Sequence, residues 1–223
     1  MRPHRPAIDG VSEQVHSGES YHQFMLASPR DQRVRERFQD LALSLLPAGA
    51  SVLDFGAGTG IDAKAYASLR HPTYVFEPSA AMSGYLALHC RDEIERKAIV
   101  PLNASLACKV HAVTANFAVL NHIADQPPLF EQLARVVEAD GFVLASMLNP
   151  YYLGDARYRW WRANLWPLLR YGHYAVDSES RLHRFAPRAV ARAAAPHFRL
   201  ERVWPGGVGR VTQLYLFLLL RRR

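Results

Sequence analysis

Three glycines directly after a short apolar segment constrain the fold of this chain more than any other feature. Residues 52–60 read Val-Leu-Asp-Phe-Gly-Ala-Gly-Thr-Gly, so a strand-like stretch leads into Gly56-x-Gly58-x-Gly60. Because glycine has no Cβ, such a turn can reverse sharply, approach a ligand closely and leave the first N–H groups of the next helix unobstructed. The segment therefore predicts a strand, a ligand-binding turn and a helix in direct succession.

The rest of the chain alternates between strand-like and helix-like stretches. Strands are expected at 51–55, 73–77, 98–102, 110–116 and 141–148. Helices are expected at 21–46, 61–69, from Pro78 onward, and at 127–138. A helix at 187–195 and two hairpin-like strands at 198–204 and 211–220 follow. Such alternation predicts an α/β fold with a mostly parallel sheet and helices on both faces.

The chain of 223 residues is long enough for one sizeable domain, and we expect residues 1–223 to form one. The polar residues 1–20 predict a mobile start. No apolar signal core follows the basic N-terminus, and the apolar run 214–220 is far shorter than the roughly 20 residues that cross a bilayer. We therefore expect a cytoplasmic protein without membrane insertion.

Two kinds of ligand commonly use a glycine-rich turn. A dinucleotide site prefers G-x-G-x-x-G, and Ile61 stands where the last of those glycines belongs, so a nicotinamide dehydrogenase is only an outside alternative. Asp54 beside the turn suits a cationic group, such as the ammonium of a methionine moiety, better than it suits a pyrophosphate. Glu77, 23 positions later, ends the next expected strand, where a carboxylate can accept hydrogen bonds from both hydroxyls of a ribose.

With these residues the chain resembles the class I S-adenosylmethionine-dependent methyltransferases of the small-molecule type, over about residues 46–148. The resemblance implies a Rossmann-like seven-stranded sheet whose last strand is antiparallel, with S-adenosyl-L-methionine at the carboxyl ends of the early strands. It also implies a helix at 21–46 that covers the cofactor. The residues that it assigns to the cofactor are Asp54, Gly56, Ala57, Gly58, Gly60, Glu77, Pro78, Met82, Asn103, Ala104, Asn116, Phe117 and Tyr21.

Two positions depart from the pattern of that family. Asn103 stands where the family often has an Asp that accepts a hydrogen bond from the adenine amino group, although an amide oxygen can also accept one. His111 stands where the fourth strand often begins with Asp. These departures keep open a binding protein that retains the fold without turnover.

A histidine follows the fourth expected strand, close to where the family binds the methionine moiety. His122 is the candidate general base, and a base is needed only if the accepting atom carries a proton at neutral pH. Packing against the cofactor and capping a helix are the alternative roles for this side chain. No metal is implied, because the two cysteines have no cluster of ligands around them.

Residues 151–184 do not fit another strand–helix unit, and they are rich in aromatic residues and arginine. The segment follows the fifth strand, where such folds build a substrate lid of helical and aromatic character. Tyr and Trp side chains there can stack on an acceptor, and Arg can pair with a carboxylate or phosphate. The candidate substrate residues are Tyr151, Tyr152, Arg157 and Trp161. The alternative is that the aromatic side chains only pack a helical cap onto the sheet.

The net charge of +7 admits nucleic acid, an anionic membrane or an acidic small molecule as a partner. The leading hypothesis is methylation of an oxygen, nitrogen or carbon of a small molecule, with oxygen as the first choice and an acidic or carrier-attached molecule as one candidate acceptor. An RNA methyltransferase is the runner-up, since the charge favours it but no RNA-binding module is recognisable. The sequence specifies neither the acceptor nor the oligomeric state.

Overall fold

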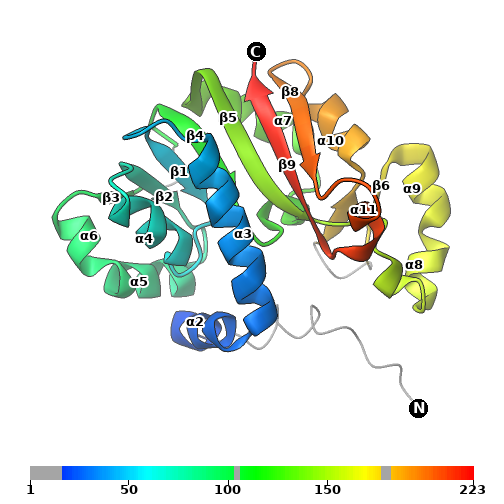
Figure 1. The fold of residues 1–223 in the computed structure, drawn as a ribbon, viewed down its shortest axis with the longest axis horizontal. Helices are drawn as coiled ribbons and strands as arrows, with labels where there is room; N and C mark the ends of the chain where they lie inside the picture. The colour runs from blue at the N-terminus through cyan, green and yellow to red at the C-terminus, as the bar shows by residue number, and fades with distance from the viewer. Residues whose placement is uncertain (1–16, 103–105, 177–181) are drawn as a thin grey trace.

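A seven-stranded sheet forms the centre of the computed structural model, which describes residues 17–102, 106–176 and 182–223 (Figure 1). The strand order is β3-β2-β1-β4-β5-β9-β8. In chain order the strands are β1 (Val52–Phe55), β2 (Thr73–Phe76), β3 (Ile99–Pro101), β4 (Val110–Ala115), β5 (Val137–Leu148), β8 (Phe198–Trp204) and β9 (Tyr215–Arg222). Only β9 runs antiparallel to its neighbours in this sheet, which confirms the predicted arrangement.

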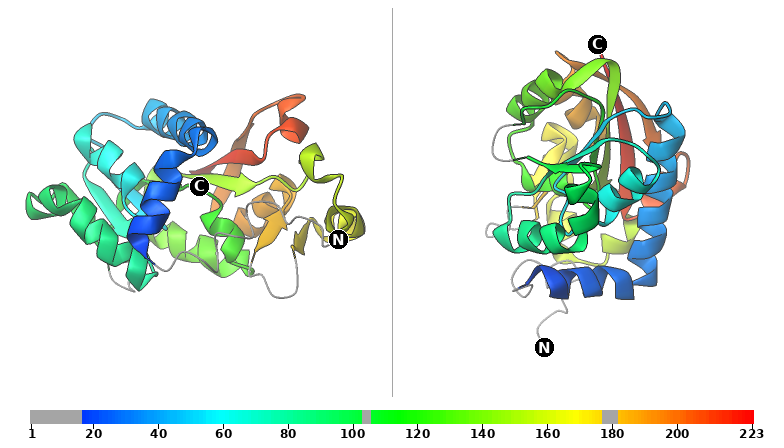
Figure 2. Two further views of the ribbon diagram at one scale, coloured as in Figure 1. Left: turned by 90° about the horizontal axis from the view of Figure 1, so that it is seen from below. Right: turned by 90° about the vertical axis from the view of Figure 1, so that its left-hand side faces the viewer.

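Helices lie on both faces of the sheet, with α3 in front and α7 and α10 behind in Figure 1. The view from below in Figure 2 shows the same layers edge-on. In chain order the helices outside the insertion are α2 (Gly18–Ala27), α3 (Pro29–Leu45), α4 (Ile61–Ser68), α5 (Ala80–His89), α6 (Arg91–Glu95), the 3-10 helix η1 (Val119–His122), α7 (Gln126–Val136), α10 (Pro187–Ala194) and α11 (Gly209–Thr212).

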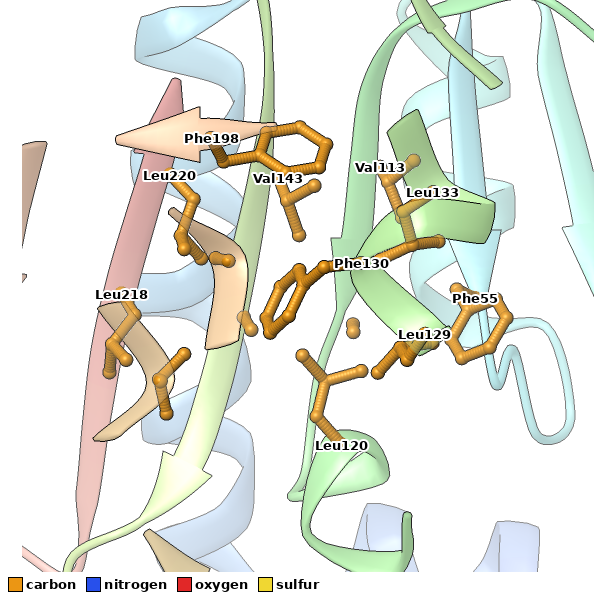
Figure 3. Packing of buried hydrophobic residues seen from close by; sticks show 14 of the residues in the cluster. Phe55, Val113, Leu120, Leu129, Phe130, Leu133, Val143, Phe198, Leu218 and Leu220 are labelled. Atoms are coloured by element: carbon orange, nitrogen blue, oxygen red, sulfur yellow. The ribbon is translucent and has the colours of Figure 1, made fainter. Parts of the chain in front are cut away.

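The core divides between the two faces because neighbouring residues of a buried strand point to opposite sides. From β5, Val143 packs with Phe130 of α7 and Phe198 of β8 in the larger cluster (Figure 3). Its neighbour Leu144 belongs to the other cluster, with Phe38 of α3. Burial on both faces explains the continuous apolar run in β5, and it holds the carboxyl ends of the parallel strands in one fixed edge.

The N-terminal segment differs from the expected single helix at 21–46. The structure has two helices, α2 and α3, which meet at Ser28. Pro29 occupies the first turn of α3, and the Ser28 hydroxyl accepts a hydrogen bond from the backbone N–H of Asp31, so the Ser-Pro pair starts a new helix. The helix α2 begins at Gly18, inside the stretch expected to be mobile, and residues 1–16 lie outside the described part.

The insertion at 151–184 contains short elements and no further strand–helix unit of the main sheet. They are η2 (Leu153–Asp155), α8 (Arg159–Ala163), α9 (Leu165–Tyr171), β6 (His173–Ala175) and β7 (His183–Phe185). The last two pair as a separate antiparallel sheet. Figure 1 shows α8 and α9 at the margin of the molecule, near β6 and α11. The chain order confirms an insertion after the fifth strand.

Two strand boundaries differ from those expected. The strand β5 begins at Val137 instead of Gly141, because Val137 pairs with Val110 before the register shifts. The strand β9 begins at Tyr215 instead of Val211, because α11 lies between it and β8. Within the described residues, none of the helices has the length and hydropathy needed to span a bilayer.

Candidate functional site

The carboxyl ends of β1 and β2 bring the glycine-rich turn and Glu77 together. Parallel pairing aligns Phe55 with Phe76, so the residues that follow these two strands emerge side by side. The backbone N–H of Gly58 donates to Glu77 Oε2 at 2.7 Å, and that of Ser79 donates to Oε1 at 2.8 Å. Both carboxylate oxygens therefore lie at this edge of the sheet, oriented by backbone donors.

The three glycines of the turn have left-handed backbone conformations for different reasons. A Cβ on Gly56 would lie 2.6 Å from the Val119 side chain, and one on Gly60 would lie 2.6 Å from Cys90 Sγ. These two glycines are thus needed for packing inside the protein. Gly58 has φ +56°, and the nearest atom to a Cβ there is Tyr21 Cε1 at 3.7 Å. The open side of the turn is therefore at Gly58.

Asp54 presents a buried carboxylate oxygen to the same edge. The residue is only 2% exposed, and Oδ1 accepts a long hydrogen bond of 3.4 Å from the Thr114 hydroxyl. Among the described residues Oδ2 has no hydrogen-bond partner. Burial, with Asp62 second, raises the pKa of Asp54 well above its ordinary value, and Arg35 partly offsets this. A cationic ligand group would satisfy the free oxygen.

A polar network lies beside Asp54 and centres on Asp62. Arg35 Nη1 lies 2.6 Å from Asp62 Oδ2, and Gln39 Nε2 donates to Oδ1 at 2.6 Å. The amide of Asn116, one of the expected cofactor residues, donates to Asp62 Oδ2 at 3.1 Å. Sequence reasoning missed Arg35 and Gln39; their spacing of four places them on one face of α3, but only the fold shows what that face contacts.

The residues that directly follow β4 lie next to this network and have a strained backbone. Phe117 and Ala118 both have positive φ angles, 53° and 64°, which non-glycine residues adopt at a cost. The Ser146 hydroxyl accepts from the N–H of Phe117 at 2.8 Å, and the Ser146 carbonyl accepts from that of Ala118 at 3.0 Å. The Arg35 guanidinium lies 4.7 Å from the centroid of the Phe117 ring, and the Tyr215 ring packs against it at 5.7 Å in a T-shaped pair.

The helix α2 covers the glycine-rich turn, and Figure 1 shows it crossing below the sheet at the carboxyl ends of the parallel strands. His22 Nδ1 lies 3.0 Å from the Thr59 hydroxyl, which ties the helix to the turn. A Cβ on Gly18 would lie 2.5 Å from the Ala81 carbonyl oxygen, so α2 approaches α5 closely. Tyr21 is thereby held at the rim of the turn, and burial raises the pKa of its hydroxyl.

His122 ends the 3-10 helix η1 and its side chain is exposed. Partial desolvation and the neighbouring His183 lower its pKa, so the imidazole is neutral at pH 7. The buried Asn121 fixes this helix, because its side chain accepts from Leu148 N at 3.0 Å and donates to the His183 carbonyl at 2.6 Å. His122 therefore stands between the end of β4 and the insertion.

The four candidate substrate residues lie in the insertion, and each of them contacts residues within it or at its borders. Trp161 Nε1 donates to the Pro150 carbonyl at 3.1 Å, and Tyr151 packs against the apolar cluster of α9 and β6. The Tyr152 ring covers Gly154, where a Cβ would have no room. Arg157 is exposed and donates to the Tyr158 hydroxyl at 2.8 Å. Local packing therefore accounts for much of this aromatic content.

A buried ion pair in the insertion involves Arg184, which the sequence did not single out. It is 2% exposed, lies 2.7 Å from Asp155 Oδ2 and donates to the Asn149 carbonyl at 2.6 Å. Asn149 itself donates to two carbonyl oxygens near α11. A buried ion pair between two distant parts of the insertion leaves no periodic pattern in the sequence, so only the fold reveals it.

The other expected residues fall in three places. Pro78 and Met82 lie at the start of α5, where the Ser79 hydroxyl accepts from Met82 N. Asn103 and Ala104 lie outside the described residues. His111 lies near the start of β4, against Phe142 at the edge opposite the glycine-rich turn. Nowhere in the described ranges do three or more His, Cys, Asp or Glu side chains form a potential metal site.

Comparison with known families agrees with this geometry. A family model for a methyltransferase domain matches residues 26–189, which is more than half of the chain. The chain therefore belongs to the class I S-adenosylmethionine-dependent methyltransferase family, and the predicted family and cofactor are confirmed. No curated protein sequence matches the chain significantly.

Several solved structures share the fold at low sequence identity. An S-adenosylmethionine-dependent methyltransferase from Mesorhizobium loti has a TM-score of 0.62 at 17% identity, over 80% of this chain and 94% of that one. The N-methyltransferase NodS from Bradyrhizobium japonicum, bound to S-adenosylhomocysteine, has 0.60 at 13%, over 89% and 90%. Magnesium protoporphyrin IX methyltransferase from Synechocystis has 0.61 at 16%, over 86% and 83%. At these identities the likeness shows the fold alone.

Proposed function

We propose that this methyltransferase acts on a small molecule, and that oxygen is the atom methylated. The observation that carries the proposal is at the carboxyl edge of the sheet: Gly58 holds Glu77 through its backbone N–H, and Tyr21 lies 3.7 Å from the Cβ position of Gly58. The Phe117 and Tyr215 rings pack together just past β4. The chain's own helices and its insertion flank this edge, which favours a small acceptor over a long polymer.

The residues at this edge fit the expected parts of S-adenosylmethionine. The open turn at Gly58 admits the methionine side, and Glu77 offers two acceptors for ribose hydroxyls. The unpartnered Asp54 oxygen suits the ammonium group. Arg35 retains donors beyond the one that binds Asp62, and these suit the carboxylate of the same moiety.

The bound cofactor supplies an electrophilic methyl group on a positively charged sulfur, which leaves as a neutral thioether. The protein then has to align the acceptor, exclude water and remove a proton from a hydroxyl acceptor. We assign proton removal to His122, because its lowered pKa keeps Nδ1 or Nε2 free to accept. Tyr215 borders Phe117, and burial raises the pKa of its hydroxyl, so it is a hydrogen-bond donor and not a base.

The insertion is proposed to form the lid over the acceptor, with Tyr151, Tyr152, Arg157 and Trp161 as its contacts. The exposed Arg157 supports an acceptor that is acidic or carrier-attached. A cytoplasmic location, expected from the sequence, is part of the same proposal.

Transfer of a labelled methyl group into a native small-molecule extract tests this function. We expect a labelled product whose mass identifies one added methyl group, and bulk RNA in a parallel reaction should stay unlabelled. Label in RNA alone would overturn the small-molecule proposal. Binding of S-adenosylhomocysteine without transfer to either pool would indicate a binding protein instead.

The role of His122 has its own test once an acceptor is known. His122→Gln should lower kcat about 100-fold at neutral pH, because a positioned base contributes at least that much, and affinity for S-adenosylhomocysteine should not change. The matched variant His197→Gln, near the amino end of β8, should keep full activity. An unchanged kcat in His122→Gln would refute the assignment of the base.

A further inference from the structure

The insertion exposes a group of large apolar side chains on its short helices η2 and α9. These residues are more than one third exposed, although the protein buries most others of their kind. We call them the outer insertion face: Leu153 (55%), Leu165 (38%), Trp166 (69%), Leu169 (67%) and Tyr171 (56%). Several large exposed apolar side chains on one short segment indicate an interaction surface.

The helix α9 supplies most of this face. On its inner side, Leu168 is only 3% exposed and packs with Tyr174 and Ala186. Trp166 and Leu169 are three residues apart and point away from Leu168, so they lie together on the exposed side of α9. Figure 1 shows α8 and α9 at the outer margin of the molecule, with no other helix beyond them.

Among the described residues of the insertion, the exposed charges are basic. Residues 151–176 contain one acid, Asp155, which is buried and paired with Arg184. The same stretch carries four exposed arginines: Arg157, Arg159, Arg162 and Arg170. From α10, Arg188 and Arg192 donate to the last carbonyls of α9 and add to the positive charge.

We propose that the outer insertion face docks on the surface of an anionic lipid bilayer. Trp and Leu side chains insert at the boundary between headgroups and acyl chains, while arginines bind lipid phosphates. Such interfacial binding needs only one apolar face with basic residues beside it, and does not need a membrane-spanning helix. The arrangement on α9 meets both requirements.

The chemistry of this face also disfavours a second copy of the chain or a nucleic acid as its partner. A symmetric contact with a second copy would bring arginines against arginines, which opposes association. A nucleic acid would engage the arginines but would leave Leu165 and Leu169 without a partner. An anionic bilayer complements the charge and the apolar side chains together.

Docking would also affect how the acceptor reaches the site, an inference that rests on the proposed function. The insertion flanks the proposed acceptor side of the site, so a docked protein would hold that side close to the lipid surface. An acceptor dissolved in the membrane could then reach the site without crossing bulk water. The docking itself does not depend on this, and it is tested without methyl transfer.

Co-sedimentation of the full chain with vesicles tests the proposal. Vesicles of phosphatidylcholine with about one third phosphatidylglycerol should bind the protein, and vesicles of phosphatidylcholine alone should bind it at least tenfold more weakly. Soluble glycerol phosphate at the same phosphate concentration should not compete, since it lacks an apolar phase. Brominated acyl chains should quench tryptophan fluorescence in the wild type but not in Trp166→Phe.

Matched variants separate the outer face from general charge and hydrophobicity. Leu169→Ala combined with Trp166→Ala should weaken binding at least tenfold, because both side chains lose their contact with acyl chains. Leu88→Ala changes a leucine that is 61% exposed on α5 and should leave binding unchanged. Arg159→Gln and Arg170→Gln should each weaken binding about fivefold, whereas the exposed Arg199→Gln should not.

Three results would overturn the proposal. The first is absence of binding to anionic vesicles while the protein still binds S-adenosylhomocysteine, which would leave the proposed function intact. The second is a concentration-dependent dimer in gel filtration that Trp166→Ala dissociates. The third is vesicle binding that Leu169→Ala with Trp166→Ala does not weaken, since another surface would then be responsible.

Discussion

The cofactor side and the insertion are held in place by different kinds of contact. At the cofactor side, backbone N–H groups of the glycine-rich turn and of the next helix orient Glu77. In the insertion, elements of three to seven residues depend on side chains such as Arg184 and Asn149. The proposed binding site of the methyl donor thus depends on a backbone shape that a short motif encodes. The proposed acceptor side is built from long-range side-chain pairs, and a mutation there should affect stability first.

The largest expected effect is on the insertion side. Asp155→Ala leaves the Arg184 guanidinium buried without its carboxylate, and this should reduce the free energy of unfolding by about 3–5 kcal/mol. Thermal unfolding should then show a melting temperature about 10 °C lower. Arg157→Ala, an exposed arginine of the same segment, should change it by less than about 2 °C. Equal stability of Asp155→Ala and wild type would mean that the ion pair does not hold the insertion.

The next effect concerns binding and not stability. Gly58→Val forces a branched side chain into a left-handed backbone at the open side of the turn, so affinity for S-adenosylhomocysteine should fall by at least about 100-fold. Calorimetry measures this. Gly206→Val, at an exposed glycine with nothing within 4 Å of its Cβ, is the matched control and should bind normally. An unaffected affinity in Gly58→Val would refute the assigned binding site.

At Asp54, pH is expected to affect both the stability of the protein and its binding of the cofactor. Its pKa is raised above the ordinary 3.8 by burial, so the folded state favours the protonated form. The resulting stability is present at low pH and is lost as pH rises through the raised pKa. Asp54→Asn should therefore melt higher than wild type at pH 7, with the difference shrinking toward pH 4. It should also bind S-adenosylmethionine about tenfold more weakly, since an amide carries no charge for the ammonium. A difference in melting temperature that is constant with pH would contradict this.

The smallest effect is expected at the border between the two regions. Tyr215→Phe keeps the ring against Phe117 but removes the hydroxyl, so kcat/KM for the acceptor should fall about fivefold. Affinity for S-adenosylhomocysteine should stay the same. The control is Tyr171→Phe, because Tyr171 is 56% exposed on α9. A loss of cofactor affinity in Tyr215→Phe would show that this residue contacts the cofactor and not the acceptor.

Most elements of the sheet could be predicted from local patterns. The strand β8 has the expected bounds, and α4 starts at the expected Ile61, because glycine and proline mark the ends of these segments. The expected helix at 21–46 was wrong as a single element, although the Ser28-Pro29 signal for its interruption was present. The start of β9 was wrong because α11 precedes it, and no periodic pattern distinguishes so short a helix from the strand that follows.

Some residues of the candidate site could also be predicted from local sequence patterns, whereas others could not. Local sequence patterns were enough to predict the methyl donor, because Asp54, the glycines and Glu77 stand at characteristic spacings within adjacent strand–helix units. Only the tertiary structure placed Arg35 and Tyr215 beside Phe117, and only it paired Arg184 with Asp155. Those contacts join positions far apart in the chain, and their energy comes from burial that exists only after the sheet, α3 and the insertion have come together.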